Sequence, residues 1–252
     1  MPGTQDGRKD MHITGSKCNY GCAAGTDAES ASVLIKFRIG GSLRFLSHIE
    51  TMRVFQRACV RAGIEIQYTE GFNPHPKLSL PLPRTVGVES EDDLLYLRVH
   101  TGRRTENQSA TSPLDCDELK KKLSDQLPRG CQLLTVSLSK DKACPQPTAA
   151  TYILPVKKEH IDEKLKAAIV RLLASESLSL QRRINDKKLR PKTVNVRGFL
   201  KSIRVDEGAV IVECSVSSAG SIRVDEILEL LELDTEKLAG PIRRAAVEWQ
   251  SN

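Results

Sequence analysis

The sequence predicts an α+β fold in which two similar halves follow one another. Apolar residues recur at three- and four-residue spacing in several segments, as in amphipathic helices, and short β-branched apolar runs lie between them. In the first half these segments follow the order β-α-β-β-α-β, which is the split βαβ arrangement of a ferredoxin-like domain. A stretch with two prolines at residues 140–148 reads as a linker. We therefore expect two tandem ferredoxin-like halves.

The first half contains one helix with clear boundaries. Ser47 and Glu50 form an S-x-x-E capping box, which predicts a helix beginning at Ser47, and Gly63 ends it. The residues expected on its buried side are Ile49, Met52, Phe55, Cys59 and Ala62. The other expected elements are strands at 33–39, 65–68, 93–100 and 131–138 and a helix at 115–126.

The second half repeats the opening of the first and then departs from it. We expect strands at 150–156, 177–182 and 209–215 and helices at 159–174 and 223–232. Residues 192–203 are basic and fit no single class. Residues 239–250, which include Trp249, look more like a helix or an extended arm than a closing strand. The second half is therefore predicted as α+β, and its last element is expected to differ from that of the first.

Composition sets outer bounds on the organisation of this chain of 252 residues. Residues 1–31 are rich in small and polar residues and are expected to be disordered, followed by domains at 32–139 and 149–252. No run of about 18 apolar residues is present, and the N-terminus lacks the apolar segment of a signal peptide, so we expect a cytoplasmic protein without membrane contact. The seven cysteines are odd in number and mostly scattered, as free thiols are. Cys18 and Cys22 are too few to hold a metal, so no metal site is predicted.

Charge is distributed unevenly along the chain, whose formal net charge is +6. Residues 182–204 contain nine basic and one acidic residue, a net charge of +8. Residues 206–252 contain four basic and ten acidic residues, a net charge of −6. A basic belt beside an acidic segment favours an anionic partner on one face of the protein.

A ladder of arginines lies on the first predicted helix. Arg53, Arg57 and Arg61 are four residues apart, so they share one helical face, and Arg44 lies just before the helix. Acidic residues are scarce around them. This pattern fits a surface for nucleic acid or another anion, and it equally fits a solvated charged face.

The segment Gly71-Phe72-Asn73-Pro74-His75-Pro76-Lys77 is stiff, because its two prolines restrict the backbone. Phe72 and His75 can stack on a base and Lys77 can contact a phosphate. The alternative is a rigid loop that only connects two strands.

These motifs resemble a known family. The runs G-S-L-R-F-L-S-H-I-E, R-V-F-Q-R-A, G-F-N-P-H-P-K-L-S-L-P-L-P and V-G-V-E-S are similar to the radical-SAM-linked domain family, a bacterial family of uncharacterised function. The resemblance is close over residues 33–100 and weaker to about residue 235. Two departures are Glu50, where the family has aspartate, and Val224, where it has proline. The resemblance implies a radical-SAM protein as partner. That partner would carry the iron–sulfur cluster and S-adenosylmethionine, with no cofactor in this chain.

Three functions are compatible with these observations. The first is an RNA-binding or polyanion-binding module, working on tRNA or rRNA beside the radical-SAM enzyme. Its contact residues would be Arg44, Arg53, Arg57, Arg61, Phe72, Asn73, Lys77, Arg182, Arg183, Lys187, Lys188, Arg190, Lys192 and Arg197. The second is an enzyme using His48, Glu50 and His75 in acid–base chemistry on a phosphorylated or nucleic-acid substrate. The third is a subunit that docks the radical-SAM partner through the leucines at positions 228, 230, 231 and 233.

Overall fold

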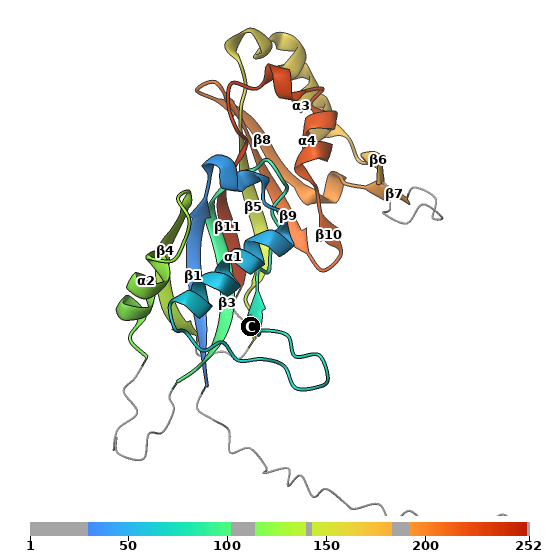
Figure 1. The fold of residues 1–252 in the computed structure, drawn as a ribbon. Helices are drawn as coiled ribbons and strands as arrows, with labels where there is room; N and C mark the ends of the chain where they lie inside the picture. The colour runs from blue at the N-terminus through green and yellow to red at the C-terminus, as the bar shows by residue number, and fades with distance from the viewer. Residues whose placement is uncertain (1–29, 102–113, 140–142, 183–191, 251–252) are drawn as a thin grey trace, which may run out of the picture.

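A computed structural model describes residues 30–101, 114–139, 143–182 and 192–250, and its centre is one long sheet of nine strands (Figure 1). The strand order is β10-β9-β5-β11-β3-β1-β4, with β2 paired to β3 and β8 paired to β9. A separate two-stranded sheet consists of β6 and β7. The mixed α+β class predicted from the sequence is confirmed.

The first half has the strand order of a ferredoxin-like domain. Its elements are β1 (Ser30–Ile39), α1 (His48–Arg61), β2 (Leu78–Ser79), β3 (Glu89–His100), α2 (Cys116–Ser124) and β4 (Cys131–Ser139). They align as β4-β1-β3-β2 with every neighbouring pair antiparallel. The strand predicted at 65–68 makes only isolated bridges, Ile66 to Val99 and Tyr68 to Pro76, and the regular pairing with β3 falls to β2 instead.

Helix α1 begins as its sequence predicts. The Ser47 side chain accepts a hydrogen bond from the backbone N–H of Glu50, and the Glu50 carboxylate accepts one from the backbone N–H of Ser47. Phe55 and Cys59 are buried as expected, together with Thr51 and Ala58. The prediction for Ile49 is wrong, because its side chain is 57% exposed in the first turn, where α1 extends past its own core.

The second half is a further copy of the same arrangement. Its elements are β5 (Gln146–Pro155), α3 (Glu163–Ala174), β8 (Leu200–Asp206), β9 (Ala209–Ser217), α4 (Val224–Leu230) and β11 (Arg243–Gln250), and they align as β11-β5-β9-β8. The hairpin of β6 (Ser179–Arg182) and β7 (Lys192–Asn195) is inserted after α3, and the short β10 (Gly220–Ser221) follows β9.

The expectation of a helix or arm at 239–250 is corrected by strand β11. Its pairing with β5 shifts register between Arg244 and Ala246 and again between Glu248 and Trp249. Each shift interrupts the two-residue alternation by which a strand is recognised. The first buried position is also occupied by an arginine rather than an apolar residue. The sequence of residues 243–250 therefore lacks the regular alternation of buried and exposed residues by which a half-buried strand is recognised.

The two halves are joined within the sheet. Strand β11 of the second half pairs in parallel with β3 of the first, Arg243 opposite Glu89 and Arg244 opposite Ser90. Each half keeps its own apolar core, yet Val88, from the first half, is buried in the core of the second. Strand pairing and packing thus both cross the junction. Among the described residues, no helix has the length and apolar character needed to cross a membrane.

Candidate functional site

The arginine ladder lies on the exposed side of α1, as the spacing predicts. Arg53 and Arg57 are exposed and make no hydrogen bond or ion pair with any described residue. Successive arginines are about 6 Å apart along the axis, because four residues rise 1.5 Å each. Together with Gln56, Val60 and Arg61 they line a shallow hollow of about 410 Å³. The hollow combines free guanidinium groups with an exposed apolar side chain.

The other two arginines of this region are partly engaged. Arg61 donates a hydrogen bond of 2.7 Å to the carbonyl of Gln126, which leaves other N–H groups of its exposed side chain free. Arg44 lies in a short 3₁₀ helix, η1 (Gly41–Phe45), and donates to the carbonyl of Gly41. Its guanidinium carbon lies 4.5 Å from the centroid of the Phe45 ring, a cation–π contact.

Residues 67–77 form an arm that projects from the lower end of the sheet (Figure 1). The backbone N–H of Thr69 donates to the carbonyl of His75, and the N–H of His75 donates to the Thr69 hydroxyl oxygen. At the tip Gly71 has φ +122°, a conformation that side chains disfavour, and it is followed by Phe72. Phe72 is fully exposed, and Asn73 and His75 are also exposed. Lys77 is half-buried at the base of the arm.

Two of the described arginines of the predicted basic belt are engaged in internal contacts. Arg182 makes a two-pronged ion pair with Glu226, at 2.6 and 2.9 Å, and also donates to the Ser221 carbonyl. Arg197 donates to the carbonyls of Leu173, Ser175 and Leu200. Both side chains therefore fix the β6–β7 hairpin and its surroundings, rather than standing free for an anion. Lys192 is exposed. Four further predicted members, Arg183, Lys187, Lys188 and Arg190, and the cysteine pair Cys18 and Cys22, lie outside the described residues.

The structure does not bring His48, Glu50 and His75 together. Glu50 accepts hydrogen bonds from Ser47, which lower the pKa of its carboxyl group. The charge of Asp93, which lies toward the junction end of β3, acts to raise the pKa of His48. His75 lies on the arm that directly precedes β2. In β2, Leu78 pairs with Leu97 of β3. Leu97 is four residues from Asp93 along β3, a separation of about 13 Å.

The imidazole of His48 is partly buried, and this burial affects its pKa. Its Nδ1 atom is buried and has no hydrogen-bond partner among the described residues. Desolvation lowers the pKa of the imidazole, and the nearby charge of Asp93 opposes that shift only in part. Burial therefore favours the neutral form of the ring.

An apolar cleft lies where the two halves meet. Its cavity volume is about 540 Å³, within the range of small-ligand sites. One wall is formed by Arg44, Phe45 and residues 85–88 of the first half, and the other by α4 and residues 235–242 of the second. Phe45 and Val86 stand at its rim with more than half of each side chain exposed. Asp225, in the first turn of α4, is exposed at the opposite rim and has no hydrogen bond or ion pair with any described residue.

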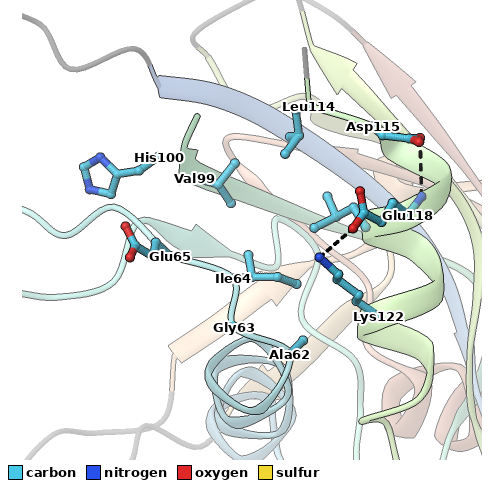
Figure 2. A pocket seen from close by; sticks show the side chains of 11 residues that line it. Ala62, Gly63, Ile64, Glu65, Val99, His100, Leu114, Asp115, Glu118 and Lys122 are labelled. Atoms are coloured by element: carbon cyan, nitrogen blue, oxygen red, sulfur yellow. Dashed lines mark hydrogen bonds and ion pairs between the residues drawn. The ribbon is translucent and has the colours of Figure 1, made fainter. Parts of the chain in front are cut away.

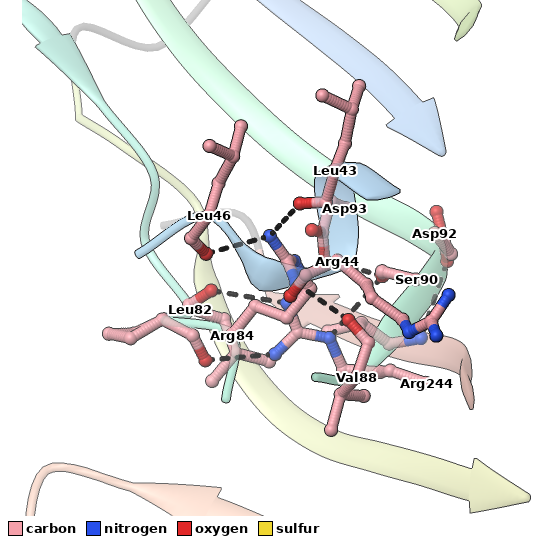
Figure 3. Close-up of polar contacts among 12 residues, drawn as sticks. Leu43, Arg44, Leu46, Leu82, Arg84, Val88, Ser90, Asp92, Asp93 and Arg244 are labelled. Carbon is pink, nitrogen blue, oxygen red and sulfur yellow. Dashed lines mark hydrogen bonds and ion pairs between the residues drawn. The ribbon is translucent and has the colours of Figure 1, made fainter. Parts of the chain in front are cut away.

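Two buried arginines hold the first-half wall of this cleft (Figure 3). Arg84 donates to four backbone carbonyls, those of Leu43, Arg44, Leu46 and Val88. Arg244, from β11, pairs with Asp93 and donates to the carbonyls of Leu82 and Pro83. Because guanidinium groups are rigid forks, these bonds fix the backbone of η1 and of residues 82–88 relative to the sheet.

Sequence reasoning missed Arg84, Asp93 and Arg244. Two of them did leave a signal, since Arg84 directly follows the stiff run P-L-P, and Asp93 directly precedes the apolar run L-L-Y-L. An acid at the start of a buried strand requires a partner, but the sequence does not show that the partner is Arg244, 151 residues away.

A further hollow, of about 300 Å³, lies between the end of α1 and the start of α2 (Figure 2). Two of its three carboxylates have structural roles: Asp115 caps α2 by accepting from the N–H groups of Asp117 and Glu118, and Glu118 pairs with Lys122 at 2.6 Å. The third carboxylate is that of Glu65. Within the part of the chain that the structure describes, no group of three or more His, Cys, Asp or Glu side chains is arranged to hold a metal ion.

Fold and surface together define a protein of two fused ferredoxin-like halves with a cationic helix face and a cleft at the junction. The chain belongs to a family described as "Uncharacterized protein conserved in bacteria (DUF2344)", whose model matches residues 33–224. No curated protein matches it. Among solved structures, one titled "Crystal Structure of an Unknown Protein from Galdieria sulphuraria" is 10% identical, with a TM-score of 0.23, over 81% of this chain and 89% of that one.

Proposed function

We propose that this protein is an accessory RNA-binding module whose contact surface runs along α1. The observation that carries the proposal is the pair Arg53 and Arg57, two exposed guanidinium groups that form no hydrogen bond or ion pair with any described residue, although the charges of Arg53 and Glu50 interact. Arg204, by contrast, is paired with Asp206. Unpaired guanidinium groups at regular spacing suit successive phosphates of a nucleic-acid strand.

The projecting arm supplies a second contact of a different kind. The fully exposed Phe72 ring keeps apolar surface in contact with water, and stacking on a base removes that surface from water, which is favourable. The hydrogen bonds between Thr69 and His75 hold the arm in shape before any ligand arrives. Phe72 therefore suits stacking on an unpaired base, while the arginines of α1 hold the backbone.

The proposal includes a partner for the chemistry. The sequence motifs resemble the radical-SAM-linked domain family, and the cytoplasm is the compartment that its free cysteines suit. Radical chemistry would thus reside in the partner, and this chain would present tRNA or rRNA to it. The enzyme alternative is less favoured, because His48 interacts with Asp93 of β3, whereas His75 lies on the arm before β2, which pairs four residues further along β3 at Leu97. The docking alternative loses its main support, since Leu231 and Leu233 are buried in the chain's own core.

The test is binding of the purified chain to tRNA and rRNA fragments across a salt series, with a double variant, Arg53→Glu and Arg57→Glu. The control variant carries Lys157→Glu and Lys158→Glu. These two lysines are also exposed and unpaired among the described residues, but they lie in the second half. Both variants change the net charge by the same amount, so long-range attraction falls equally in the two.

We expect the α1 variant to lose roughly tenfold or more in affinity, with a shallower dependence on salt, because fewer counterions are released. The control should bind close to wild type. Equal losses of affinity in the two variants would show that only the net charge of the protein matters, and would refute α1 as the contact surface. Absence of any RNA binding by the folded wild-type protein would refute the function itself.

A further inference from the structure

The cleft at the junction has the composition of a small-ligand site. Most of its lining is apolar, from Val86, Val88, Leu228, Leu238, Pro241 and Ile242. A few polar groups converge on its rim, and its volume of about 540 Å³ is far larger than one or two water molecules require. An apolar cavity with a few convergent polar groups at a junction between domains is the usual form of a ligand site.

One rim of the cleft is a ready stacking platform. The guanidinium group of Arg44 lies over the ring of Phe45, and 58% of the Phe45 side chain remains exposed. Aromatic rings and guanidinium planes are the two kinds of surface on which proteins stack unpaired bases. The platform is rigid, because Arg84 is bonded to the carbonyls of Leu43, Arg44 and Leu46 behind it.

Both rims carry charges that suit different parts of a nucleotide. Arg44, already bonded to the Gly41 carbonyl, has further N–H groups for a phosphate. Glu89 lies 3.8 Å from the same guanidinium, so the platform is cationic but not strongly so. On the facing rim the Asp225 carboxylate makes no hydrogen bond or ion pair with a described residue, although its charge interacts with that of Arg182. A carboxylate accepts hydrogen bonds from the exocyclic amino group of a base.

We propose that this cleft receives a single unpaired nucleotide of the bound RNA. This inference rests on the proposed function and names the class of RNA that the protein recognises. The base enters between the Arg44–Phe45 platform and the apolar wall of α4, its phosphate lies at Arg44, and an amino group of the base donates to Asp225. The cleft adjoins the start of α1, so an RNA strand that follows Arg57 and Arg53 toward the junction arrives at its mouth.

The geometry favours a single-stranded region over a duplex. A paired base has its edge engaged and both faces stacked, so it cannot enter a cleft between two rims without first leaving the helix. The unstacking energy is smallest for a base in a loop or bulge. The RNA class is therefore one with an accessible unpaired nucleotide carrying an amino group, that is adenine, cytosine or guanine.

The experiment measures binding of the full chain to two RNAs of equal length. One is a hairpin with 2-aminopurine in its loop, whose fluorescence falls on stacking, and the other is a fully paired duplex. The variants are Phe45→Ala, which removes the platform, and Val86→Trp, which fills the cleft from its exposed rim without removing any polar group. The control is Val170→Ala, an exposed apolar side chain on α3. Thermal unfolding verifies that each variant is folded.

We expect both cleft variants to weaken hairpin binding by about 5-fold to 150-fold, the range measured for losing one stacked base, and to abolish the fluorescence change. Duplex binding, which uses the α1 arginines, should be unchanged. Hairpin binding at wild-type strength in both variants would overturn the inference while leaving the proposed function intact. Wild-type protein that binds neither RNA would overturn both. Binding of free AMP or CMP in the cleft without RNA binding would assign it to a small nucleotide and likewise overturn both.

Discussion

Arg244 and Asp93 form a buried ion pair that joins the two halves of the protein. Arg244 belongs to β11 and Asp93 to β3, and their side chains are 1% and 8% exposed. Asp93 also accepts a hydrogen bond of 2.7 Å from the hydroxyl of Ser90. One residue earlier on β11, Arg243 pairs with Glu91 at 2.8 Å, but there both side chains are more than 40% exposed. The same two strands therefore carry a buried pair and an exposed pair side by side.

This arrangement predicts very different costs for removing each acid. Asp93→Ala leaves a buried guanidinium without its counter-charge, and the free energy of unfolding should fall by about 3–5 kcal/mol. Glu91→Ala leaves a cation in contact with water and should cost at most about 1 kcal/mol. Urea denaturation of both variants measures the difference. Similar losses for the two would show that the buried pair does not hold the junction.

A second prediction concerns the salt dependence of RNA binding. Arg57→Ala should weaken binding and reduce the slope of log affinity against log salt by about 0.7, the contribution of one phosphate contact on a single strand. Arg204→Ala is the matched change at a cation whose charge is already paired, with Asp206 at 3.1 Å, so its slope should remain that of wild type. A filter-binding titration at four salt concentrations gives both slopes. An unchanged slope for Arg57→Ala would remove that residue from the contact surface.

Phe72 provides a third prediction, which separates stacking from charge. Because the side chain is fully exposed, Phe72→Ala should leave the melting temperature unchanged. It should nonetheless reduce affinity for single-stranded RNA by about 5-fold to 150-fold, as the loss of one stacked base does. The salt slope should stay the same, since no phosphate contact is lost. Unaltered RNA affinity would mean that the arm has a different partner, and a pull-down with the radical-SAM protein would then be the next measurement.

How much of this could be predicted depended on the distance between partners in the sequence. The cap at Ser47 and the arginine spacing on α1 are local, so the sequence predicted them correctly. Strand β11 could not be recognised, because its bulges break the alternation and its buried arginine needs an acid 151 residues away. Arg182 looked like a surface cation for the same reason, since its partner Glu226 is 44 residues distant. The cleft is assembled from four separate segments and had no sequence signature at all.

The last prediction follows from the unpartnered, partly buried imidazole of His48. Burial holds its pKa below the usual value of about 6.5, whereas in the unfolded chain the pKa is the usual one. As pH falls below about 6.5, the unfolded state therefore takes up a proton that the folded state does not, and stability is lost. The variant His48→Gln cannot take up this proton, so it should lose less stability than wild type between pH 7 and pH 5. Urea denaturation at several pH values tests this, and NMR titration of the His48 ring gives the pKa directly. A ring that titrates above pH 6.5, with a larger loss of stability in the variant than in wild type on acidification, would show instead that the attraction of Asp93 outweighs desolvation.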